Sequence, residues 1–418
     1  MRQFIFSIFI SFSSVLMAQV TTITSGAEKV SLADCFRLAD ENNLSLQTVM
    51  MNVDKAQLME GTAWDVDKTE LTLSQDPTSG GSPDNSLSLS QTIDFPTRYV
   101  ALRHQLKAET NSRQSEVAVV NNQLHGRIAS LYYQLVYLKE KLNILQRQDT
   151  ILSHYENIAL KRYNAGEVRQ LEPLNASRLR HENQLAITTA QTEYANTQTE
   201  LARLLGNNIM VEPSIQIDSS LFTIPSSLSY SFSKTPEGQL ADAQLHVADE
   251  AVKVERTGFL PSLTIALRTQ MVIKGWNPYH VNRGWNDGNF MGFEIGVGVP
   301  IFTGATKARV KAAKKQREQL SIQFRNEAQL RESQYTAAMN SMLAARHQLD
   351  YYTQSGNNEA DETARISALA YECGEISYIE YVAALQQSID TRLKYATAVN
   401  DYNQAAIKLM TLNGTIER

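Results

Sequence analysis

Two stretches of the chain carry apolar residues at alternating steps of three and four, the spacing of a helix that packs in a coiled coil. The first stretch has Leu124, Ile128, Leu131, Leu135, Leu138, Leu142 and Leu145, and the second has Tyr335, Ala338, Met342, Ala345, Leu349 and Tyr352. This pattern predicts long helices from Arg98 to about Asp149 and from Thr306 to about Asn357. At 1.5 Å per residue each is on the order of 75 Å long, and soluble domains seldom contain such helices.

Four shorter segments alternate between apolar and polar residues with the period of two that is typical of β-strands. They are TELTLSQ, NSLSLSQTIDF, PSLTIALRTQMVI and MGFEIGVGVPIF. About ten residues of such alternation is what a transmembrane strand requires. Alternation alone would favour the edge hairpin of a soluble sandwich, but the long helical stretch after each pair of segments reverses that preference.

A further helix is predicted before each pair of strands. SLADCFRLADENNLSLQ opens with Ser31, a favourable N-cap residue, and then has apolar residues at helical spacing, so this helix should run to about Met59. PEGQLADAQLHVADEAVKVE is its counterpart later in the chain. Both halves of the chain therefore have the order helix, two strands, long helix.

The two halves also share sequence. YNAGEVRQLEPLNA returns as YECGEISYIEYVAA at an offset of 208, whereas the upstream apolar patterns superpose at an offset of 207, so one residue was inserted between them. The period of about 200 residues is too long for a solenoid, whose repeats run about 20 to 50 residues. We predict a signal peptide at residues 1–18, a first repeat at 19–206, a linker at 207–235 and a second repeat at 236–418.

The N-terminus predicts that the mature chain leaves the cytoplasm. MRQFIFSIFISFSSVLMAQ has one early charge, an apolar run and small residues near Ala18, as a secretory signal peptide does, and the run is shorter than the ~20 residues of a membrane span. No apolar run of membrane length follows it. A membrane form of this chain would therefore have to be a β-barrel.

Charge and motifs exclude several functions. The net charge is -5 with both signs interspersed, which does not suit a nucleic-acid partner. The two cysteines, one in each repeat, argue against a disulfide framework and a thiolate metal site. The seven histidines show no metal-ligand spacing, and phosphate-binding glycine loops and HExxH are absent. We therefore expect no catalytic, cofactor or metal residues.

Six sequence words in order, SLADCFRLADENNLSLQ, SQTIDFPTRY, RYNAGEV, GFLPSLTIAL, VGVPIFTGATKARVKAA and AYECGEI, resemble the TolC-type outer-membrane efflux protein family across nearly all of the mature chain. The DFPTRY form is most similar to the branch that serves heavy-metal efflux pumps. The resemblance implies a mainly α fold with a transmembrane β part. Long coiled-coil hairpins would form a periplasmic tunnel, and four strands per protomer would contribute to a trimeric twelve-stranded barrel in the outer membrane.

Strand number supports a trimer independently of the resemblance. Four strands cannot close a barrel, and an open edge has no hydrogen-bond partners in hydrocarbon. Eight strands leave an interior that side chains fill, whereas twelve begin to enclose a lumen. Alternate residues point to opposite sides of a strand, so Ile265 and Val297 should face lipid, and Arg268 and Glu294 should face the barrel lumen.

The repeated words are predicted to form the tips of two helical hairpins. Gly166 and Gly374 each follow an aromatic residue and precede a new helical pattern, as a glycine with positive φ does at a helix end. By resemblance, the tips meet a periplasmic adaptor (membrane fusion) protein. The adaptor-facing candidates are Tyr163, Ala165, Gly166, Glu167 and Val168, with Tyr371, Cys373, Gly374, Glu375 and Ile376. Glycines that only cap their helices remain the alternative.

The resemblance also implies a periplasmic gate six residues beyond each tip glycine. Those positions hold Glu172 and Glu380, and the second gate position holds Asn175 in the first repeat. Six carboxylates in a trimer would attract cations to a narrow opening. Solvated surface glutamates are the equally weighted alternative.

The function implied is that of a passive exit duct that works with an adaptor and an inner-membrane transporter, expected to be of the RND type, and that exports heavy-metal cations or drugs. A duct for type I protein secretion has the same architecture and stays open as an alternative. A periplasmic coiled-coil interaction protein without a barrel is the alternative from another class. An enzyme is the least expected class.

Overall fold

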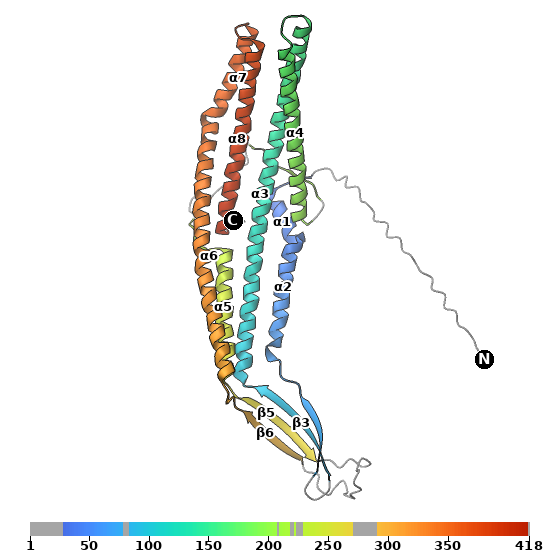
Figure 1. The fold of residues 1–418 in the computed structure, drawn as a ribbon, viewed down its shortest axis with the longest axis vertical. Coiled ribbons are helices and arrows are strands. Elements are labelled where there is room, and N and C mark those ends of the chain that lie inside the picture. The colour runs from blue at the N-terminus through green and yellow to red at the C-terminus, as the bar shows by residue number, and fades with distance from the viewer. Residues whose placement is uncertain are drawn as a thin grey trace, which may run out of the picture.

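The computed structural model describes residues 28–77, 83–206, 209–217, 221–222, 229–270 and 291–416. The predicted signal peptide, residues 1–18, lies outside these residues. Figure 1 shows an elongated molecule with two helical hairpins that end in tips at one end and a small sheet at the other.

Each half of the chain has the order of elements that the sequence predicts. The first half contains β1 (Glu28–Val30), α1 (Leu32–Asn42), α2 (Leu44–Glu60), η1 (Gly61–Trp64), β2 (Glu70–Pro77), β3 (Pro83–Asp94), α3 (Pro96–Asn164) and α4 (Leu171–Leu204). After β4 (Val211–Pro213) and η3 (Phe232–Lys234), the second half contains α5 (Pro236–Thr257), β5 (Ser262–Gln270), β6 (Met291–Gly298), α6 (Gly304–Tyr351), η4 (Tyr352–Gly356), α7 (Asn357–Glu372) and α8 (Tyr378–Asn413).

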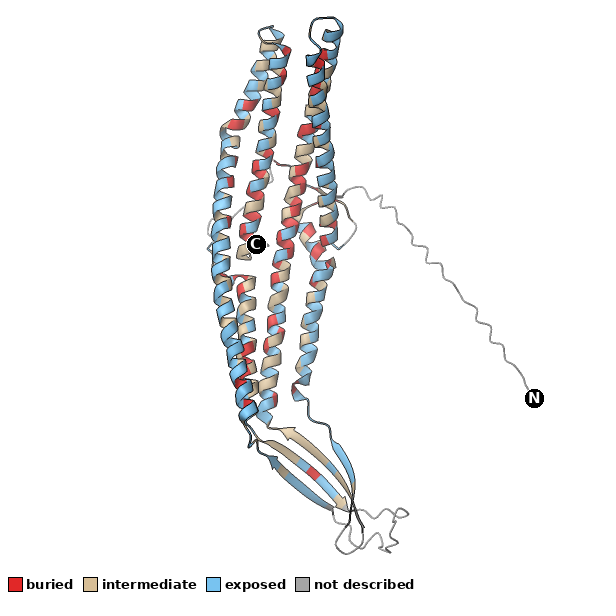
Figure 2. Cartoon of the chain, viewed as in Figure 1, coloured by how far each residue is buried: buried red, intermediate tan, exposed pale blue. Residues whose placement is uncertain are grey.

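The predicted apolar stripes lie on the inward faces of α3 and α6. Six of the seven stripe residues of α3 are buried, and Leu142 is half-buried; on α6, Ala338, Ala345 and Leu349 are buried. At 69 residues, α3 is longer than predicted, about 100 Å at 1.5 Å per residue. Figure 2 shows the buried residues in narrow lines along the long helices, which is the arrangement expected of coiled-coil packing.

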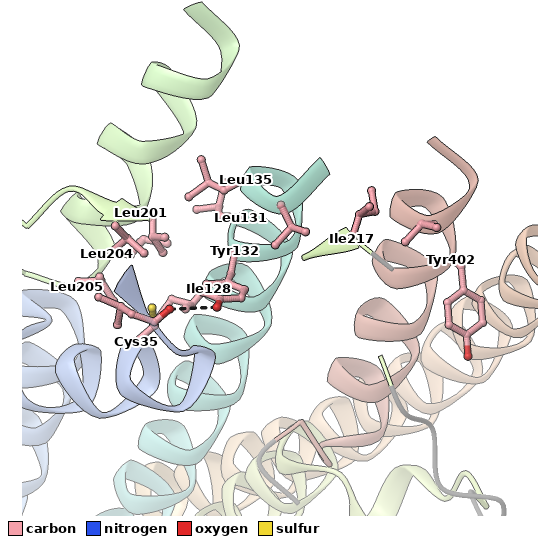
Figure 3. Close-up of a cluster of buried hydrophobic side chains, with 14 of the residues drawn as sticks. Cys35, Ile128, Leu131, Tyr132, Leu135, Leu201, Leu204, Leu205, Ile217 and Tyr402 are labelled. Atoms are coloured by element: carbon pink, nitrogen blue, oxygen red, sulfur yellow. Dashed lines mark hydrogen bonds between the residues drawn. The ribbon is translucent and has the colours of Figure 1, made fainter. Parts of the chain in front are cut away.

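The main core lies about halfway along the helices, where α1, α4 and α8 pack on α3. Its labelled members in Figure 3 are Cys35, Ile128, Leu131, Tyr132, Leu135, Leu201, Leu204, Leu205, Ile217 and Tyr402. Tyr132 is fully buried, and its hydroxyl donates a hydrogen bond to the Val30 carbonyl at 3.0 Å. Because Val30 ends β1, which pairs in parallel with β4, this bond ties the short sheet to α3.

The prediction of a single helix from Ser31 to about Met59 is wrong. The structure has two helices here, α1 and α2, which are separated at Asn43. The Asn43 side chain accepts a hydrogen bond from the Leu46 amide at 3.0 Å and donates one to the Leu204 carbonyl at 2.7 Å. Asparagine favours such local side-chain bonds over a continuing helix. The break therefore ties α2 to the end of α4.

Glycines with positive φ mark the repeat. Among the described residues they are Gly166 (75°), Gly206 (69°), Gly374 (74°) and Gly414 (68°). Gly166 matches Gly374 and Gly206 matches Gly414 at the offset of 208 that the sequence words give. The internal duplication is thus visible in the backbone as well as in the sequence.

The inserted residue of the second repeat coincides with a π-helix. The sequence offset is 207 as far as Tyr352 and 208 from Tyr371 onward, and the π-helix Tyr352–Gly356 lies between these two positions. The matching part of α3 is uninterrupted α-helix. Since a π turn absorbs one extra residue, α7 can pack against α8 without a change in the register of α6.

Deleting Gln354 from the π-helix is expected to leave the thermal stability of the folded protein unchanged, because the deletion restores the continuous helix that α3 has. Deleting Arg147, the matching exposed residue of α3, should rotate the rest of that helix by about 100°. That rotation turns Leu152 and Tyr155 out of their buried cluster, whose burial is worth roughly 1.5–3 kcal/mol per side chain. Thermal unfolding of the two purified variants compares the deletions, and an equal loss of stability in both would contradict the interpretation that one residue was inserted.

The four predicted strands form one antiparallel sheet with the order β2-β3-β5-β6. The last strand is shorter than predicted, because β6 ends at Gly298 and the residues from Val299 to Phe302 are not in a strand. Pro300 lies in this segment and lacks the N–H that a ladder needs. The sheet therefore leaves β2 and β6 as open edges in one protomer.

Candidate functional site

The two predicted tips are built by the same backbone geometry. The Gly166 amide donates to the Tyr163 carbonyl at 2.9 Å, and the Glu167 amide donates to the Arg162 carbonyl at 2.9 Å. Around Gly374 the matching bonds measure 3.0 and 2.8 Å. This pattern, with glycine at positive φ, is the Schellman motif that ends helices tightly. The turn-forming role predicted for both glycines is therefore confirmed, whereas their contact with an adaptor stays a prediction.

Most of the candidate tip side chains are exposed. In the first tip Tyr163, Ala165, Gly166 and Glu167 are exposed and Val168 is half-buried; in the second Cys373, Gly374 and Glu375 are exposed and Tyr371 and Ile376 are half-buried. A Cβ added at either tip glycine would meet nothing within 4 Å. The tips therefore offer open surfaces on which another protein can approach the backbone.

The tips differ in their aromatic residues, which sequence reasoning missed. Tyr371 stacks on Tyr381 with ring centroids 5.2 Å apart, and Tyr378 lies 5.2 Å from Tyr155 of α3. Burial raises the pKa of Tyr378 to about 12. Tyr378 and Tyr381 belong to the second repeat only, since the first has Gln170 and Pro173 at these places. This tyrosine cluster joins the second hairpin to the first, and the unmatched YIEY was the signal for it.

Glu172 lies between the helices of the first hairpin. Its carboxylate accepts a hydrogen bond from the Arg162 guanidinium at 3.4 Å, and its side chain is only 10% exposed. It also helps to raise the pKa of Tyr155, behind the effect of burial. Within one protomer this carboxylate already has a cationic partner.

Glu380 has a different environment. It forms a capping box at the start of α8, in which its carboxylate accepts from the Ser377 amide at 2.7 Å and the Ser377 hydroxyl accepts from the Glu380 amide at 3.3 Å. These bonds lower the pKa of Glu380, so the side chain stays ionised at neutral pH. Glu380 and Asn175 are both exposed. The two glutamates are thus related by the repeat but not by their contacts.

The pairing register places apolar side chains in rows across one face of the sheet. One row runs Leu71, Leu89, Leu267 and Phe293 across all four strands. Among the strand residues whose burial the structure describes, the face also carries Leu73, Leu87, Ile93, Leu263, Ile265, Ile295 and Val297, with Gln91 and Thr269 as the polar exceptions. Ile265, Phe293 and Val297 are exposed to the surroundings of the protomer. An exposed apolar face of this kind suits hydrocarbon.

The opposite face is polar or small. It carries Thr72, Ser74, Ser86, Ser88, Ser90, Thr92, Ser262, Thr264, Ala266, Arg268, Gly292, Glu294, Gly296 and Gly298. Arg268 and Glu294 form an ion pair at 3.8 Å on this face, and the Thr92 and Thr264 hydroxyls lie 3.0 Å apart. Both residues predicted to face a lumen are thus on the face opposite Ile265 and Val297.

The helices of the described ranges include none that combines the length and the apolar character needed to cross a bilayer. In the same ranges, no group of three or more His, Cys, Asp and Glu side chains is placed to hold a metal ion.

The sequence model described as "Outer membrane efflux protein" matches residues 38–207 and 234–415. The two matched segments correspond to the two halves of the duplication. Together they cover well over half of the chain.

Individual relatives are more distant. The pyoverdine export outer membrane protein OpmQ of Pseudomonas putida is 22% identical over 374 residues, which are 88% of this chain and 75% of OpmQ. Among solved structures, CusC superposes with a TM-score of 0.76 at 18% identity, covering 92% of both chains. The CmeC outer membrane channel of Campylobacter jejuni has a TM-score of 0.76 at 18% identity, covering 92% of this chain and 85% of CmeC. These two structures therefore share the fold of this chain over nearly its whole length.

Proposed function

The chain belongs to the outer membrane efflux protein family, and on this premise we propose that three copies form the exit duct of a tripartite pump for metal cations or small organic molecules. The duct receives its cargo from an inner-membrane transporter of the RND type through a periplasmic adaptor. The observation that carries the proposal is the two-faced sheet at the root of two long helical hairpins. OpmQ, whose name specifies pyoverdine export, supports a small cargo rather than a secreted protein.

The open edges of the sheet support the proposed trimer. β2 and β6 each present unpaired backbone groups on one side, and these groups need partners in hydrocarbon. Pairing β6 of one copy with β2 of the next in a ring of three satisfies both edges and gives twelve strands. The apolar rows then face lipid, and Arg268 and Glu294 face the lumen.

The adaptor is proposed to meet the two tips. Both are Schellman turns with open space around the glycine, so an adaptor can pack directly against the backbone. Loops held by a rigid scaffold are favourable places for recognition. The exposed side chains beside the two glycines are those of Tyr163, Ala165, Glu167, Cys373 and Glu375.

The gate is proposed to be formed by Glu172 and Glu380 of the three copies, with Asn175 beside them. In this arrangement the Arg162 partner neutralises part of the charge at Glu172, and the ionised Glu380, which is exposed, supplies most of the field. A ring of carboxylates in a narrow mouth favours cations.

Replacing both Glu172 and Glu380 with glutamine is expected to weaken the cation preference of the open pore and to remove its block by divalent ions, since carboxylates bind these hard cations. The folded trimer should persist, because glutamine can still accept from Arg162 and can complete the capping box with Ser377. Planar-bilayer recordings of wild type and the double variant measure both properties.

The control is Glu375→Gln, which removes an exposed tip carboxylate outside the proposed gate and should leave selectivity unchanged. Wild-type selectivity and divalent sensitivity in the double variant would place Glu172 and Glu380 on the outer surface, and the gate would then lie elsewhere on the helices.

A further inference from the structure

The turn that leaves the sheet exposes large apolar side chains. Val299, Ile301 and Phe302 are 65, 81 and 95% exposed, although they lie outside any strand. They directly continue the apolar face of β6, which carries Phe293, Ile295 and Val297. The surface that meets hydrocarbon therefore extends beyond the sheet to the first residues of α6.

The first turns of α6 are strongly basic. Between Gly304 and Arg317 the sequence has Lys307, Arg309, Lys311, Lys314, Lys315 and Arg317 and no acidic residue. Lys307, Lys311 and Lys314 follow one another at steps of four and three, so they share one helix face. All three are exposed. We call this surface the lysine face.

The lysine face points away from α5. Thr306 and Val310, the buried residues of this part of α6, lie on another side of the helix. A Cβ added at Gly258, the last residue of the α5 cap, would lie 3.0 Å from Thr306 Cγ2, which shows that this side packs against α5. The lysine side chains are therefore free to reach past the protomer surface.

Nearby carboxylates are bound by other cations. Glu255 pairs with Arg309 at 3.4 Å, Asp249 pairs with Arg317 at 2.9 Å, and Glu250 pairs with Lys253 at 2.7 Å. Lys315 pairs with Glu318. In the described ranges, no ion pair within 4.0 Å is formed by Lys307, Lys311 or Lys314. The positive charge of the lysine face is thus not neutralised within the protomer.

We propose that the lysine face binds the headgroups of anionic phospholipids in the leaflet of the outer membrane that faces the periplasm. The apolar turn sets how deeply the protein sits in the membrane. Phe302 lies at the boundary between the acyl chains and the headgroups, and α6 begins two residues later, outside the hydrocarbon. At 1.5 Å per residue, the three lysines lie about 5 to 15 Å further along the helix. Their long side chains can extend back toward the headgroups while their stems cover apolar surface.

The charge and the position both favour lipid as the occupant. Clusters of lysine next to a membrane-embedded segment are attracted to anionic lipid, roughly fivefold per lysine near the surface. The opposite edge of the protomer carries Asp65 and Asp67, so a neighbouring copy is the competing partner. Continuity between the lysine face and the apolar face of β6 favours lipid, because the proposed function places that apolar face against hydrocarbon.

The test uses the full-length trimer in bilayers of phosphatidylcholine with trace spin-labelled lipid. Wild type should associate with spin-labelled phosphatidylglycerol several-fold more than with spin-labelled phosphatidylcholine. Salt at 1 M should reduce this ratio of the two associations, because the Debye length falls to about 3 Å and electrostatic attraction is screened. The variant with Lys307→Gln, Lys311→Gln and Lys314→Gln should show a ratio near one while its trimer stays intact.

A charge-matched control carries Arg147→Gln, Lys394→Gln and Lys408→Gln, three exposed positions, and should keep the wild-type ratio. Arg147 lies about 75 Å along α3 from its start next to the sheet, and the two lysines lie on α8, which Figure 1 shows in the half of the molecule away from the sheet. The proposal is overturned if wild type shows no preference for the anionic lipid or if the triple variant keeps the preference. Loss of trimer stability in detergent for the triple variant, together with no lipid preference in wild type, would assign the lysines to the neighbouring copy instead. Because the assay measures lipid association alone, its failure leaves the proposed adaptor and gate untouched.

Discussion

Replacing Ile265 with arginine is expected to remove the folded trimer from the outer membrane, whereas replacing the adjacent Thr264 with arginine is expected to be mild. Ile265 lies in the apolar rows, between Gln91 and Ile295, and an arginine at the lipid midplane costs roughly 2–4 kcal/mol per copy. Thr264 lies on the polar face, where the added guanidinium reaches water and only the hydrogen bond with Thr92 is lost.

Trimer abundance in outer-membrane fractions, compared by unheated and heated electrophoresis, separates the two variants. The pair is closely matched, because both add the same side chain to adjacent positions of β5. Loss of the trimer with Thr264→Arg but not with Ile265→Arg would show that the assignment of the two faces is reversed.

Placing tryptophan at Gly166 or Gly374 is expected to abolish pump-dependent transport while leaving trimer levels near those of wild type. The added Cβ meets nothing within 4 Å, so the fold bears only the strain of a positive φ, about 1–2 kcal/mol. The bulky ring would instead occupy the space that an adaptor needs. Crosslinking from Ala165→Cys to the adaptor should fall at least tenfold.

Gly206→Ala and Gly414→Ala are the matched controls, since both glycines also have positive φ but lie in packed surroundings. An added Cβ would lie 2.2 Å from the Asn42 carbonyl oxygen at Gly206 and 2.4 Å from Pro236 Cδ at Gly414. These small substitutions should therefore lower trimer levels, the opposite of the result at the tips. Wild-type transport in both tryptophan variants, without an adaptor crosslink, would leave the tip glycines with a capping role only.

The native cysteines offer an independent measurement at the second tip. Cys373 is exposed, whereas Cys35 is fully buried and burial raises its pKa to about 12. A maleimide should therefore react at Cys373 alone in the folded trimer. Attachment of a bulky maleimide before the adaptor is added should block binding as tryptophan at Gly374 does.

Patterns with many repeated positions were predicted correctly from the sequence. The heptad stripe around Leu131 and the alternation around Ile265 each depend on several residues that agree, so single exceptions such as Gln91 do not change the result. The duplication gave a second, independent reading of each element. The sequence also predicted which residues share a face of each strand, because side chains alternate between the faces and a shift by one residue would expose the wrong set.

Features that depend on single side chains were not predicted. The break between α1 and α2 depends on one contact from Asn43 to the end of α4, which lies 161 residues away in the sequence. His125 is another example: no contact was predicted for it, but it is buried, its ring stacks on Phe36 with centroids 4.4 Å apart, and its Nε2 lies 2.7 Å from Asp40 Oδ1. Long-range contacts of this kind leave no periodic signal.

The sequence predicted where the two tip turns lie, but it did not predict the contacts that Glu172 and Glu380 make. The repeat located both tips and paired Glu172 with Glu380, because related positions are read directly from the offset. The offset could not show that Glu172 binds Arg162. The capping box of Glu380 did have a sequence signal, because Ser377 lies three residues before Glu380 and is replaced by Arg169 in the first repeat. Equivalence in the sequence therefore did not imply equivalent contacts.

The central claim is that three copies of this chain span the outer membrane as one duct. The most direct test is carbonate extraction of membranes separated by density, followed by electrophoresis with and without heating. The account predicts carbonate-resistant protein in the outer-membrane fraction, migrating as a trimer that dissociates to one chain of 46.8 kDa or slightly less on heating. A protein released into the soluble periplasmic fraction as a monomer would contradict it.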